Sequence, residues 1–468
     1  MPAERFDVVV VGAGISGIGA GVHLNDKSPD RSFVILEGRE DIGGTWDLFK
    51  YPGIRSDSDM HTLGYEFKPW KAEKSIADGP SIMAYLRETV EEHDLNRHMR
   101  FGERVVRAEW STQNATWSVY TQRSDGSHGT FECNYLFMCA GYYSYKAGYL
   151  PEFPGREKFG GTIVHPQEWP EDLDYSNKRV VVIGSGATAV TIVPAVAETA
   201  AHVTMLQRSP TYMVSRPDTD ALANFLRRIL PAQLAYNITR AKNTWRQQLV
   251  YKQTRSNPDQ ITMLLLGGVQ LELGGKYPIK RHFLPRYNPW DQRLCLVPNS
   301  DFFAAMRSGR ASVVTDNIET FTETGILLSS GEHLNADIIV TATGLQLVSR
   351  MWLSRRHTYV QVRSARSVHD ALMYPKLVAR FGTSLYAMPL YVRVWAKSTC
   401  WPSTEMSASP SDTNCNPVAV TMMSALRCSP DDSKIPVSVK VSMLSVTTDA
   451  RPLRIAAKKS EFGTRHKR

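Results

Sequence analysis

The sequence contains few cysteines, and their positions exclude the usual thiol-based sites. Six occur among 468 residues, and no two form a C-x-x-C pair or a zinc-binding spacing. A reducing cytoplasm is therefore the compartment that we expect. Cys133 and Cys139 lie six residues apart on one predicted strand, so we expect them on the same face. We interpret them as packed thiols, with a redox pair as the alternative.

Neither a secretory signal nor a membrane span is predicted near the N-terminus. The apolar run 6–11 leads directly into a glycine turn, which no signal peptide does. The segment from Phe6 to Leu24 is about as long as a membrane span. It contains five glycines, however, and these favour a strand, a turn and a helix.

Glycine and acidic residues become scarce after about residue 346. Residues 351–468 contain 2 of the 31 glycines, and 18 basic side chains against 7 acidic ones. The first 350 residues hold 37 basic and 39 acidic side chains, so the net charge of +9 comes from the tail. The body has the composition of an ordinary globular protein of two or three domains.

A strand, a glycine loop and a helix open the chain in the pattern of a dinucleotide-binding unit. The β-branched run 6–11 is followed at once by Gly12-Ala13-Gly14-Ile15-Ser16-Gly17. The three glycines permit a tight turn, a close approach to a pyrophosphate, and packing of the helix on the strand. Glu37 ends the next strand, where a carboxylate accepts hydrogen bonds from a ribose. The alternative is a tight turn with a buried acid.

The segments that follow favour FAD over NAD in this first unit. Gly43-Gly44-Thr45-Trp46 offers a close backbone approach and then a large flat side chain, with plain core packing as the alternative for Trp46. This region lacks the C-x-x-x-x-C pair of disulfide-reducing flavoenzymes. A later strand ends in Ala140-Gly141, whose small residues allow contact with a flavin. The tyrosines that follow, Tyr142, Tyr143, Tyr145 and Tyr149, could line a pocket or form a hinge wall.

A second dinucleotide unit begins near residue 178 and lacks the acid of the first. The strand 178–183 leads into Gly184-Ser185-Gly186-Ala187-Thr188-Ala189, the G-x-G-x-x-A form of the loop. The next strand ends in Gln207-Arg208-Ser209, and an arginine there suits the 2′-phosphate of NADPH. A solvent-exposed surface charge is the alternative for Arg208. Two such units in one chain imply hydride transfer from NADPH to FAD.

The stretch between the two units, Phe159–Pro170, reads F-x-G-x-x-x-H-x-x-x-W-P. It resembles the fingerprint of the type I Baeyer–Villiger flavin monooxygenases. The segments 43–57 and 337–344 resemble further motifs of that family, and the resemblance covers roughly residues 5–348. It implies an α/β fold with two Rossmann-like domains, for FAD and NADP, and a helical insertion.

The resemblance also implies an activity, that of an NADPH-dependent flavin monooxygenase. In the family, reduced flavin and O₂ give a C4a-peroxyflavin, which oxidises ketones to esters and S-oxygenates sulfides or thioamides. The expected partners are therefore such small molecules and O₂, with no nucleic acid. A flavin N- or S-oxygenating monooxygenase of the sister group is the nearest alternative. A non-catalytic remnant is the alternative from another class.

Roles for individual residues follow from the same resemblance. Arg293 matches the catalytic arginine, whose charge would stabilise a developing oxyanion, with a structural ion pair as the alternative. Asp57 matches the active-site aspartate, which would hold that arginine near the flavin. Arg55 and Ser56 would lie beside the nicotinamide nucleotide. His165 falls in the interdomain linker, so a hinge or hydrogen-bonding role is favoured over that of a general base.

The predicted domains and cofactor contacts can be stated together. The domains are an FAD-binding domain over 1–150, an NADP-binding domain over 151–210 and 290–345, a helical insertion over 211–289, and an atypical basic tail over 346–468. The candidate cofactor-binding residues are Gly12, Gly14, Ser16, Gly17, Glu37, Gly44, Thr45, Trp46, Arg55, Ser56, Asp57, Val105, Gly184, Ser185, Gly186, Ala187, Thr188, Ala189, Arg208 and Ser209.

Two segments leave alternatives open. The tail reads either as an out-of-frame translation starting near residue 346 or as a natural, basic and mostly disordered extension. Within the insertion, Leu264–Leu266 and the basic segment 276–281 could touch a membrane surface. Ordinary packing with a solvated rim is the favoured interpretation of these two segments of the insertion.

Overall fold

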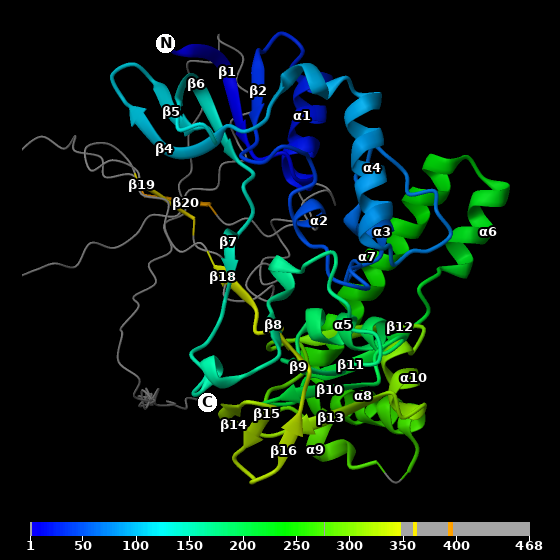
Figure 1. The fold of residues 1–468 in the computed structure, drawn as a ribbon. Helices are drawn as coiled ribbons and strands as arrows, with labels where there is room; N and C mark the ends of the chain where they lie inside the picture. Colours follow the sequence, from blue (N-terminus) through cyan, green and yellow to red (C-terminus); the bar gives the residue numbers. More distant parts are fainter. Residues whose placement is uncertain (1, 276, 348–358, 363–391, 396–468) are drawn as a thin grey trace, which may run out of the picture.

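The structure is a computed structural model that describes residues 2–275, 277–347, 359–362 and 392–395. Two α/β domains lie one above the other in Figure 1, each built on its own mostly parallel sheet. The predicted tail falls almost entirely outside the described residues. Within it, β19 (Tyr359–Val362) and β20 (Val392–Trp395) form an antiparallel pair.

The first domain is built on a six-stranded sheet. Its strands, in order across the sheet, are β3 (Met99–Arg100), β2 (Phe33–Leu36), β1 (Glu4–Val11), β6 (His128–Met138), β5 (Thr116–Gln122) and β4 (Arg104–Ser111). The last three strands form an antiparallel meander. The residues Val8–Val11 are all buried because β1 lies between β2 and β6, with both faces of the sheet covered.

Helices α1 (Ile15–Lys27) and α4 (Gly79–Glu92) cover one face of this sheet and share a core with Val8 and Val10. Asp78 caps α4 by accepting a hydrogen bond from the backbone N of Ser81 at 2.8 Å. The segment from Phe6 to Leu24 is therefore a strand, a turn and a helix, as predicted. In the described part of the chain, every helix is too short or too polar to cross a bilayer.

The prediction that Cys133 and Cys139 share a face is wrong. Cys133 packs with Val9 in the cluster on one face, whereas Cys139 packs against the cluster on the α1 side. Strict alternation fails because β6 leaves β5 after Cys133, and Leu136, three residues later, lies on the same face as Cys133. Both are free thiols, as predicted, and burial raises the pKa of each to about 12.

The second domain contains a five-stranded parallel sheet. Its strands, in order across the sheet, are β13 (Ala311–Thr315), β10 (His202–Gln207), β9 (Arg179–Ile183), β17 (Ile338–Thr341) and β8 (Thr162–Val164). Helices α5 (Ala187–Val196) and α10 (Asp301–Arg307) pack on one face. The small antiparallel sheet of β14 (Ile318–Thr322), β15 (Gly325–Leu328) and β16 (His333–Asn335) packs on the other.

The segment predicted as a helical insertion is partly integrated into the second domain. Residues 212–216 form β11 (Tyr212–Arg216), which pairs with β12 (Leu294–Pro298). Buried residues of α8 (Pro258–Leu273) and α9 (Ile279–Phe283) belong to the core of this domain. Leu266 packs against that core and Ile279 is buried in it, whereas Leu264 is exposed, so contact with a membrane surface stays a prediction.

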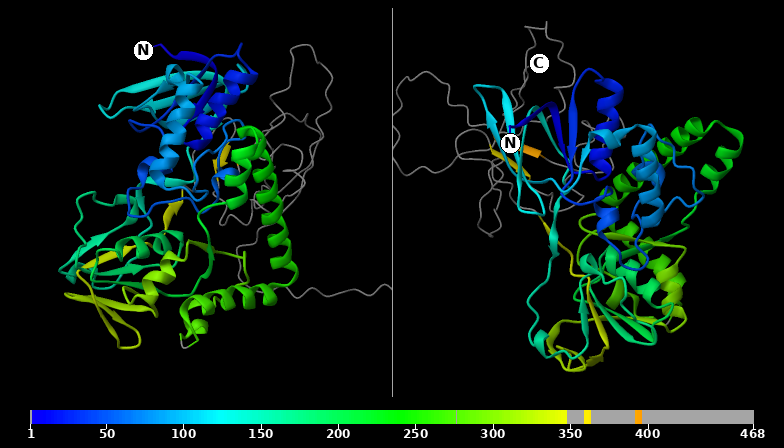
Figure 2. Two further views of the ribbon diagram at one scale, coloured as in Figure 1. Left: turned by 90° about the vertical axis from the view of Figure 1, so that its right-hand side faces the viewer. Right: turned by 45° about the horizontal axis from the view of Figure 1, so that its top comes forward.

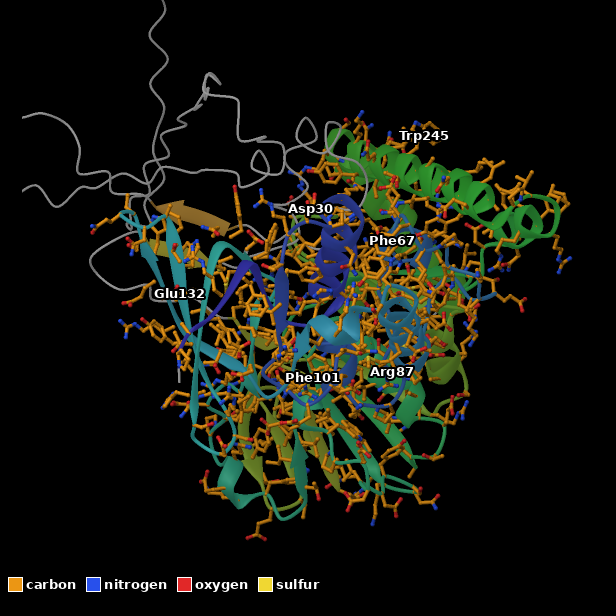
Figure 3. The ribbon with its side chains drawn as sticks, turned by 90° about the horizontal axis from the view of Figure 1, so that it is seen from above. Asp30, Phe67, Arg87, Phe101, Glu132 and Trp245 are labelled. Carbon is orange, nitrogen blue, oxygen red and sulfur yellow. The ribbon has the colours of Figure 1, made fainter. Side chains whose placement is uncertain are left out.

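Helix α7 (Ala232–Ser256) runs from the second domain alongside the first, as both views in Figure 2 show. Near its middle, the buried guanidinium of Arg240 donates to the backbone carbonyls of His61 at 2.8 Å and Gly64 at 2.9 Å. Its outer face is apolar in places, and Trp245 points away from the molecule in Figure 3. The preceding helix α6 (Ala221–Ile229) extends this exposed surface.

Candidate functional site

The first glycine loop has the geometry of a pyrophosphate cradle. Gly12 has a φ of 102°, and a Cβ on Gly17 would stand 1.8 Å from the carbonyl oxygen of Gly12. Neither position can therefore carry a side chain without moving the backbone. Ser16 lies in the first turn of α1. The free backbone N–H groups of this turn point out of the N-terminal end of the helix.

Glu37 lies where the sequence predicted it, at the end of β2 beside this loop. Its Oε2 accepts a hydrogen bond from the backbone N–H of Ala13 at 2.7 Å, and its Oε1 accepts one from the backbone N–H of Arg39 at 3.0 Å. The backbone N of Glu103 donates to the carbonyl oxygen of Glu37, which brings Val105 of β4 into the same neighbourhood. Each carboxylate oxygen keeps a lone pair that can accept from a ribose hydroxyl, so these residues fit FAD.

The second glycine pair lies directly against the first loop. Gly43 and Gly44 have φ angles of 106° and 57°, and a Cβ on Gly14 would stand 3.7 Å from the Cα of Gly44. Helix α2 (Thr45–Leu48) starts here, and the hydroxyl groups of Thr45 and Tyr143 hydrogen bond at 2.7 Å. The Trp46 side chain packs against the α1 core, which agrees with the core-packing alternative for it.

The segment 51–57 leaves the first domain and contacts the second. A Cβ on Gly53 would stand 2.8 Å from the Cβ of Ala195 in α5, so the turn rests on that helix. The Tyr51 hydroxyl interacts with the side chain of Thr188 in the second glycine loop. Arg55 forms an ion pair with Asp301, at the start of α10. The hydroxyl of Ser56 donates to the backbone oxygen of Ser58, within its own turn.

The second glycine loop repeats the architecture of the first. Gly184 has a φ of 136°, and a Cβ there would stand 2.3 Å from the carbonyl oxygen of Ala342. The Ser185 hydroxyl donates to the carbonyl oxygen of Ser209 at 3.1 Å, which ties the loop to the end of β10. Helix α5 starts directly after Gly186, and its first turn contains Ala187, Thr188 and Ala189. The N–H groups of this turn face the space above the sheet.

At the end of β10, Gln207 and Arg208 occupy the place that Glu37 occupies at the end of β2 in the first unit. Gln207 is buried, and its Nε2 donates to the carbonyl oxygen of His282 at 2.7 Å. Arg208 is exposed and forms no hydrogen bond or ion pair with any other residue that the structure describes. A free guanidinium at this place fits the 2′-phosphate of NADP.

Arg293 and Asp57 come from different domains, and the charges of both act on one buried thiol, that of Cys295. A Cβ on Gly186 would stand 3.9 Å from Nη1 of Arg293, so this exposed arginine lies over the second glycine loop. The pKa of Cys295 is raised to about 11, mainly by burial. A hydrogen bond with Thr211 lowers this pKa, the charge of Asp57 raises it, and the charge of Arg293 lowers it. Both charges are therefore near the same sulfur atom.

Asp57 lies in a recess and keeps contact with solvent. Its side chain is exposed, yet protein surrounds it on most sides. The resulting desolvation raises the pKa of the Asp57 carboxyl, and the charge of Arg55 opposes this effect. A carboxyl group of this kind is suited to orienting a neighbouring cation and to exchanging a proton with the cleft.

His165 has the hydrogen-bonding role favoured for it. Its Nε2 lies 3.1 Å from the carbonyl oxygen of Gly344, and its Nδ1 accepts from the backbone N of Gln167. The ring also packs on β7 (Tyr143–Gly148), because a Cβ on Gly148 would stand 1.8 Å from the Cε1 of His165. β7 pairs with β18 (Leu345–Leu347), so His165 braces the two strands that connect the domains.

The rest of the fingerprint stretch belongs to the second domain. Phe159 packs against the β14–β16 side of the sheet, β8 forms its edge strand, and Trp169 joins the core on the α5 side. Between β8 and Trp169, His165 caps the short 3₁₀ helix Pro166–Glu168. The stretch is therefore a structural element, with His165 as its contact to the linker.

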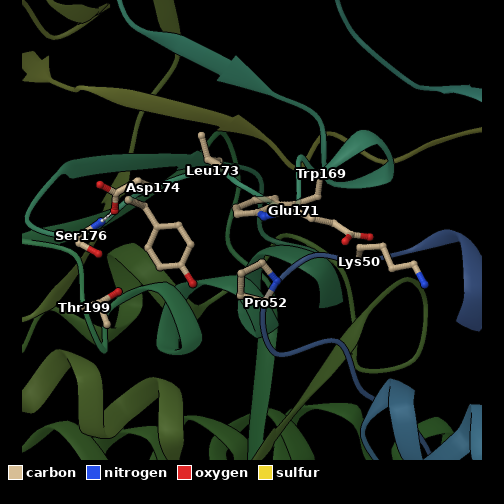
Figure 4. A pocket seen from close by; sticks show the side chains of 9 residues that line it. Lys50, Pro52, Trp169, Glu171, Leu173, Asp174, Ser176 and Thr199 are labelled. Carbon is tan, nitrogen blue, oxygen red and sulfur yellow. Dashed lines mark hydrogen bonds between the residues drawn. The ribbon is translucent and has the colours of Figure 1, made fainter.

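A recess of about 590 Å³ lies between residues of the two domains (Figure 4). Lys50 and Pro52 line it from the first domain, and Trp169 and Asp174 line it from the second. Its lining includes neither glycine loop and none of the candidate arginines Arg55, Arg208 and Arg293. It is therefore distinct from the cofactor clefts.

Sequence reasoning missed two residues of the site. Asp301 binds Arg55, and the only local signal is that it follows Asn299-Ser300 at a helix start. In the sequence, Tyr145 is marked only as part of an aromatic run, yet its hydroxyl lies 3.1 Å from the position of a Cβ on Gly44. Both contacts join segments that are far apart in the sequence.

The chain matches two family descriptions and many known proteins. Residues 10–72 match the NAD(P)-binding Rossmann-like domain, and residues 74–254 match the flavin-binding monooxygenase-like family. The chain is 56% identical over 348 residues to the FAD-containing monooxygenase EthA of Mycobacterium tuberculosis, covering 74% of this chain and 70% of that protein. It is 51% identical over 345 residues to the probable FAD-binding monooxygenase AlmA of Acinetobacter baylyi, covering 74% and 69%.

Solved structures show the same fold. An oxidized steroid monooxygenase bound to NADP has a TM-score of 0.61 at 25% identity, covering 74% of this chain and 72% of that chain. The open crystal structure of cyclohexanone monooxygenase has a TM-score of 0.62 at 22% identity, covering 74% and 75%. Both are structural neighbours of the two-domain body described above.

Proposed function

The chain belongs to the FAD-containing monooxygenases of the flavin-binding monooxygenase-like family, and we propose that it carries out Baeyer–Villiger oxidation of ketones and S-oxygenation of sulfides and thioamides. It is an NADPH-dependent flavin monooxygenase with two Rossmann-like domains. The reaction consumes NADPH, a proton and O₂. One oxygen atom enters the substrate and the other leaves as water.

The observation that carries the proposal is that Asp57 and Arg293, from different domains, both act electrostatically on Cys295, whose thiol lies against the second glycine loop at Ser185. The segment that holds Asp57 starts in the first domain and rests on α5 of the second. Residues from the FAD-binding unit thus stand next to the expected position of the nicotinamide nucleotide. This proximity is what hydride transfer between two bound dinucleotides requires.

Each residue has a distinct role in this proposal. Glu37 accepts hydrogen bonds from the FAD ribose, and Arg208 binds the 2′-phosphate of NADPH. Bound FAD supplies the redox chemistry and the activation of oxygen. Arg293 places a positive charge where negative charge develops on the substrate oxygen, and such a group contributes on the order of 100-fold or more in rate.

Asp57 orients Arg293, and its raised pKa lets the carboxyl exchange a proton within the cleft. Arg55 is paired with Asp301 and so is held at the boundary between the domains. Ser56 shapes the turn between Arg55 and Asp57 through its hydrogen bond to Ser58. In this arrangement the turn 55–57, and not His165, carries the first domain's contribution to the reaction.

The test is product analysis with the purified full-length chain, FAD, NADPH and two substrates, a simple ketone and a thioether. We expect an ester from the ketone and a sulfoxide from the thioether, with one NADPH consumed per product. Sulfoxide without ester would replace the proposal by the N- or S-oxygenating alternative. A chain that carries FAD but consumes no NADPH would contradict both and favour a non-catalytic remnant.

A further inference from the structure

The hydroxyl of Tyr145 lies at the surface where the two glycine segments of the first domain meet. It stands 3.1 Å from the position of a Cβ on Gly44 and 4.0 Å from that of a Cβ on Gly141. The Cα of Gly14 in turn lies 3.2 Å from that same Cβ position on Gly44. Two segments that are predicted to contact FAD, at Gly44 and Gly141, therefore lie beside the phenol group, and the third, at Gly14, lies against Gly44.

Two further hydroxyl groups are next to that of Tyr145. Tyr143 is buried, its hydroxyl hydrogen bonds Thr45 Oγ1 at 2.7 Å, and its ring centroid lies 5.3 Å from that of Tyr145. We call Thr45, Tyr143 and Tyr145 the hydroxyl cluster. Its members come from the start of α2 and from β7, so the linker strand contributes to the first domain's cleft.

The electrostatics of the cluster show which proton is available to a ligand. Burial raises the pKa of Tyr145, and so does the charge of Glu37, whereas hydrogen bonds from Tyr143 and Thr45 lower it. A group that lowers the pKa of a phenol stabilises its anion by donating to it. The hydrogen bond with Thr45 lowers the pKa of Tyr143, and the one with Tyr143 lowers that of Tyr145, so Thr45 donates to Tyr143 and Tyr143 donates to Tyr145. The proton of Tyr145 itself is left to donate outside the cluster.

We propose that Tyr145 donates its hydroxyl proton to the pyrophosphate of FAD, as an additional cofactor-binding residue opposite the glycine loop. Backbone N–H groups at the α1 terminus hold the phosphates from one side, and the hydroxyl cluster holds them from the other. Thr45 and Tyr143 act as positioning residues, because they fix the direction of the Tyr145 hydroxyl. The inference rests on FAD binding and not on the oxygenation chemistry proposed above.

The other tyrosines of the same run do not share this position. Tyr142 is 43% exposed and is influenced by Asp57, while Tyr149 is 53% exposed and contributes backbone hydrogen bonds to Thr343 and Gly344. Tyr149 is therefore a matched control. It belongs to the same segment, and losing its hydroxyl should leave the cleft unchanged.

The experiment measures the dissociation constant of FAD for the full chain, by the change in flavin fluorescence, in three proteins. These are the unaltered chain, Tyr145→Phe and Tyr149→Phe. A hydrogen bond to a charged group corresponds to about a 10-fold or larger change in affinity, so Tyr145→Phe should bind FAD at least about 10-fold more weakly. Tyr149→Phe should match the unaltered chain, and thermal melting should be similar in all three.

A competition with ADP distinguishes the pyrophosphate from the flavin end of the cofactor. ADP carries the pyrophosphate without the flavin, so its competition against FAD should weaken by the same factor in Tyr145→Phe. Loss of FAD affinity with unchanged ADP affinity would overturn the assignment to the pyrophosphate. An unchanged FAD affinity in Tyr145→Phe, or failure of the unaltered chain to bind FAD, would overturn the proposal altogether.

A second variant excludes the opposite effect of the same ring. If the phenol obstructs the cleft, Tyr145→Ala should bind FAD more tightly than the unaltered chain, and the proposal is then wrong. If the hydroxyl binds the cofactor, Tyr145→Ala should bind at least as weakly as Tyr145→Phe. The Phe variant keeps the ring, so it remains informative even where the Ala variant fails to fold.

Discussion

Arg55 and Asp301 form an ion pair that joins the two domains, 246 positions apart in the sequence. Both side chains are mostly shielded, at 17% and 29% exposure. Arg55 also lies close enough to Asp57 to oppose the rise in the pKa of that carboxyl. One guanidinium therefore links the start of α10 to the turn that carries the proposed active-site aspartate.

Replacing Asp301 by Asn should loosen this connection. Arg55 would lose its anionic partner, and NADPH would have to order the 55–57 turn on binding, so we expect its KM to rise several-fold. The melting temperature should fall only slightly, because ion pairs with partial exposure contribute on the order of 1 kcal/mol or less. Asp7→Asn removes a more exposed ion pair, with Arg31, and should leave the KM unchanged. Equal KM values in both variants would contradict the role given to Asp301.

Arg293→Ala should separate the two half-reactions. Reduction of the flavin by NADPH should persist, whereas oxygenation should fall by about 100-fold or more, because the lost charge acts on the developing oxyanion. Stopped-flow reduction and product yield measure the two steps independently. Arg286→Ala, an exposed arginine on the same segment, should change neither step. A parallel loss of both steps in Arg293→Ala would assign the residue to folding or nucleotide binding.

Arg208→Ala should remove the preference for NADPH over NADH. The arginine is exposed and free of partners among the described residues, so its loss leaves no buried charge behind. We expect kcat/KM for NADPH to drop by about 10-fold or more, as befits a lost charge-assisted hydrogen bond. The value for NADH should change little and serves as the internal control. A similar decrease with both nucleotides would indicate a general disturbance of the second domain.

The stability of the chain should decrease as the pH falls below about 6.5. Burial lowers the pKa of His61, aided by Arg227 and Lys242 and opposed by Asp59 and Asp220, and its Nδ1 has no partner in the described structure. A lowered folded-state pKa means that the unfolded chain binds more protons. The stabilisation is therefore complete when the pH is above the pKa that His61 has in the unfolded chain. It is lost as the pH falls through the lower pKa that His61 has in the folded chain.

His61→Gln should flatten this dependence. Urea unfolding at several pH values between 7.5 and 5 gives the slope of stability against pH for each variant. His333→Gln is the control, since that side chain is exposed on β16 and hydrogen bonds only Thr322. If His61→Gln shows the same slope of stability against pH as His333→Gln and the unaltered chain, the assignment to His61 is wrong.

Gly148→Ala should destabilise the connection between the domains. The new methyl group would overlap the His165 ring, and overpacking of this kind costs about 1–3 kcal/mol. Gly268→Ala in α8 is the matched control, because nothing lies within 4 Å of its Cβ position. An alanine within a helix is favoured over glycine by roughly 0.5–1 kcal/mol, so this control should be neutral or stabilising. Thermal melting of both variants gives the comparison.

The local parts of the fold could be predicted because they depend on neighbours in the sequence. The run Phe6–Val11, the glycine loop and Glu37 specify a strand, a turn and an acid in fixed register, and the structure places them so. Arg208 follows the same logic at the end of β10. Spacing alone was sufficient at these positions because each feature lies within one supersecondary unit.

Contacts between distant segments could not be predicted in this way. Asp301 has no local sequence signal for its pairing with Arg55. Tyr145 reaches Gly44 only because β7 lies against the start of α2, where Tyr143 hydrogen bonds Thr45. Cys139 does not follow the alternation of faces along a strand, because β6 stops pairing with β5 after Cys133. The alternatives for residues 346–468 concern positions that the structure for the most part does not describe.

The strand pair of β7 and β18 determines how the domains can move. In the described chain, the path from the first domain to the second runs through Tyr143–Gly148, and Leu345–Leu347 comes back beside it in the same ladder. Two separate tethers would constrain two independent points, but two hydrogen-bonded strands bend and twist as one ribbon. Rotation of one Rossmann unit over the other is thereby reduced to few degrees of freedom. A change in the torsion of this ribbon would alter the Arg55–Asp301 contact and the direction of the Tyr145 hydroxyl together.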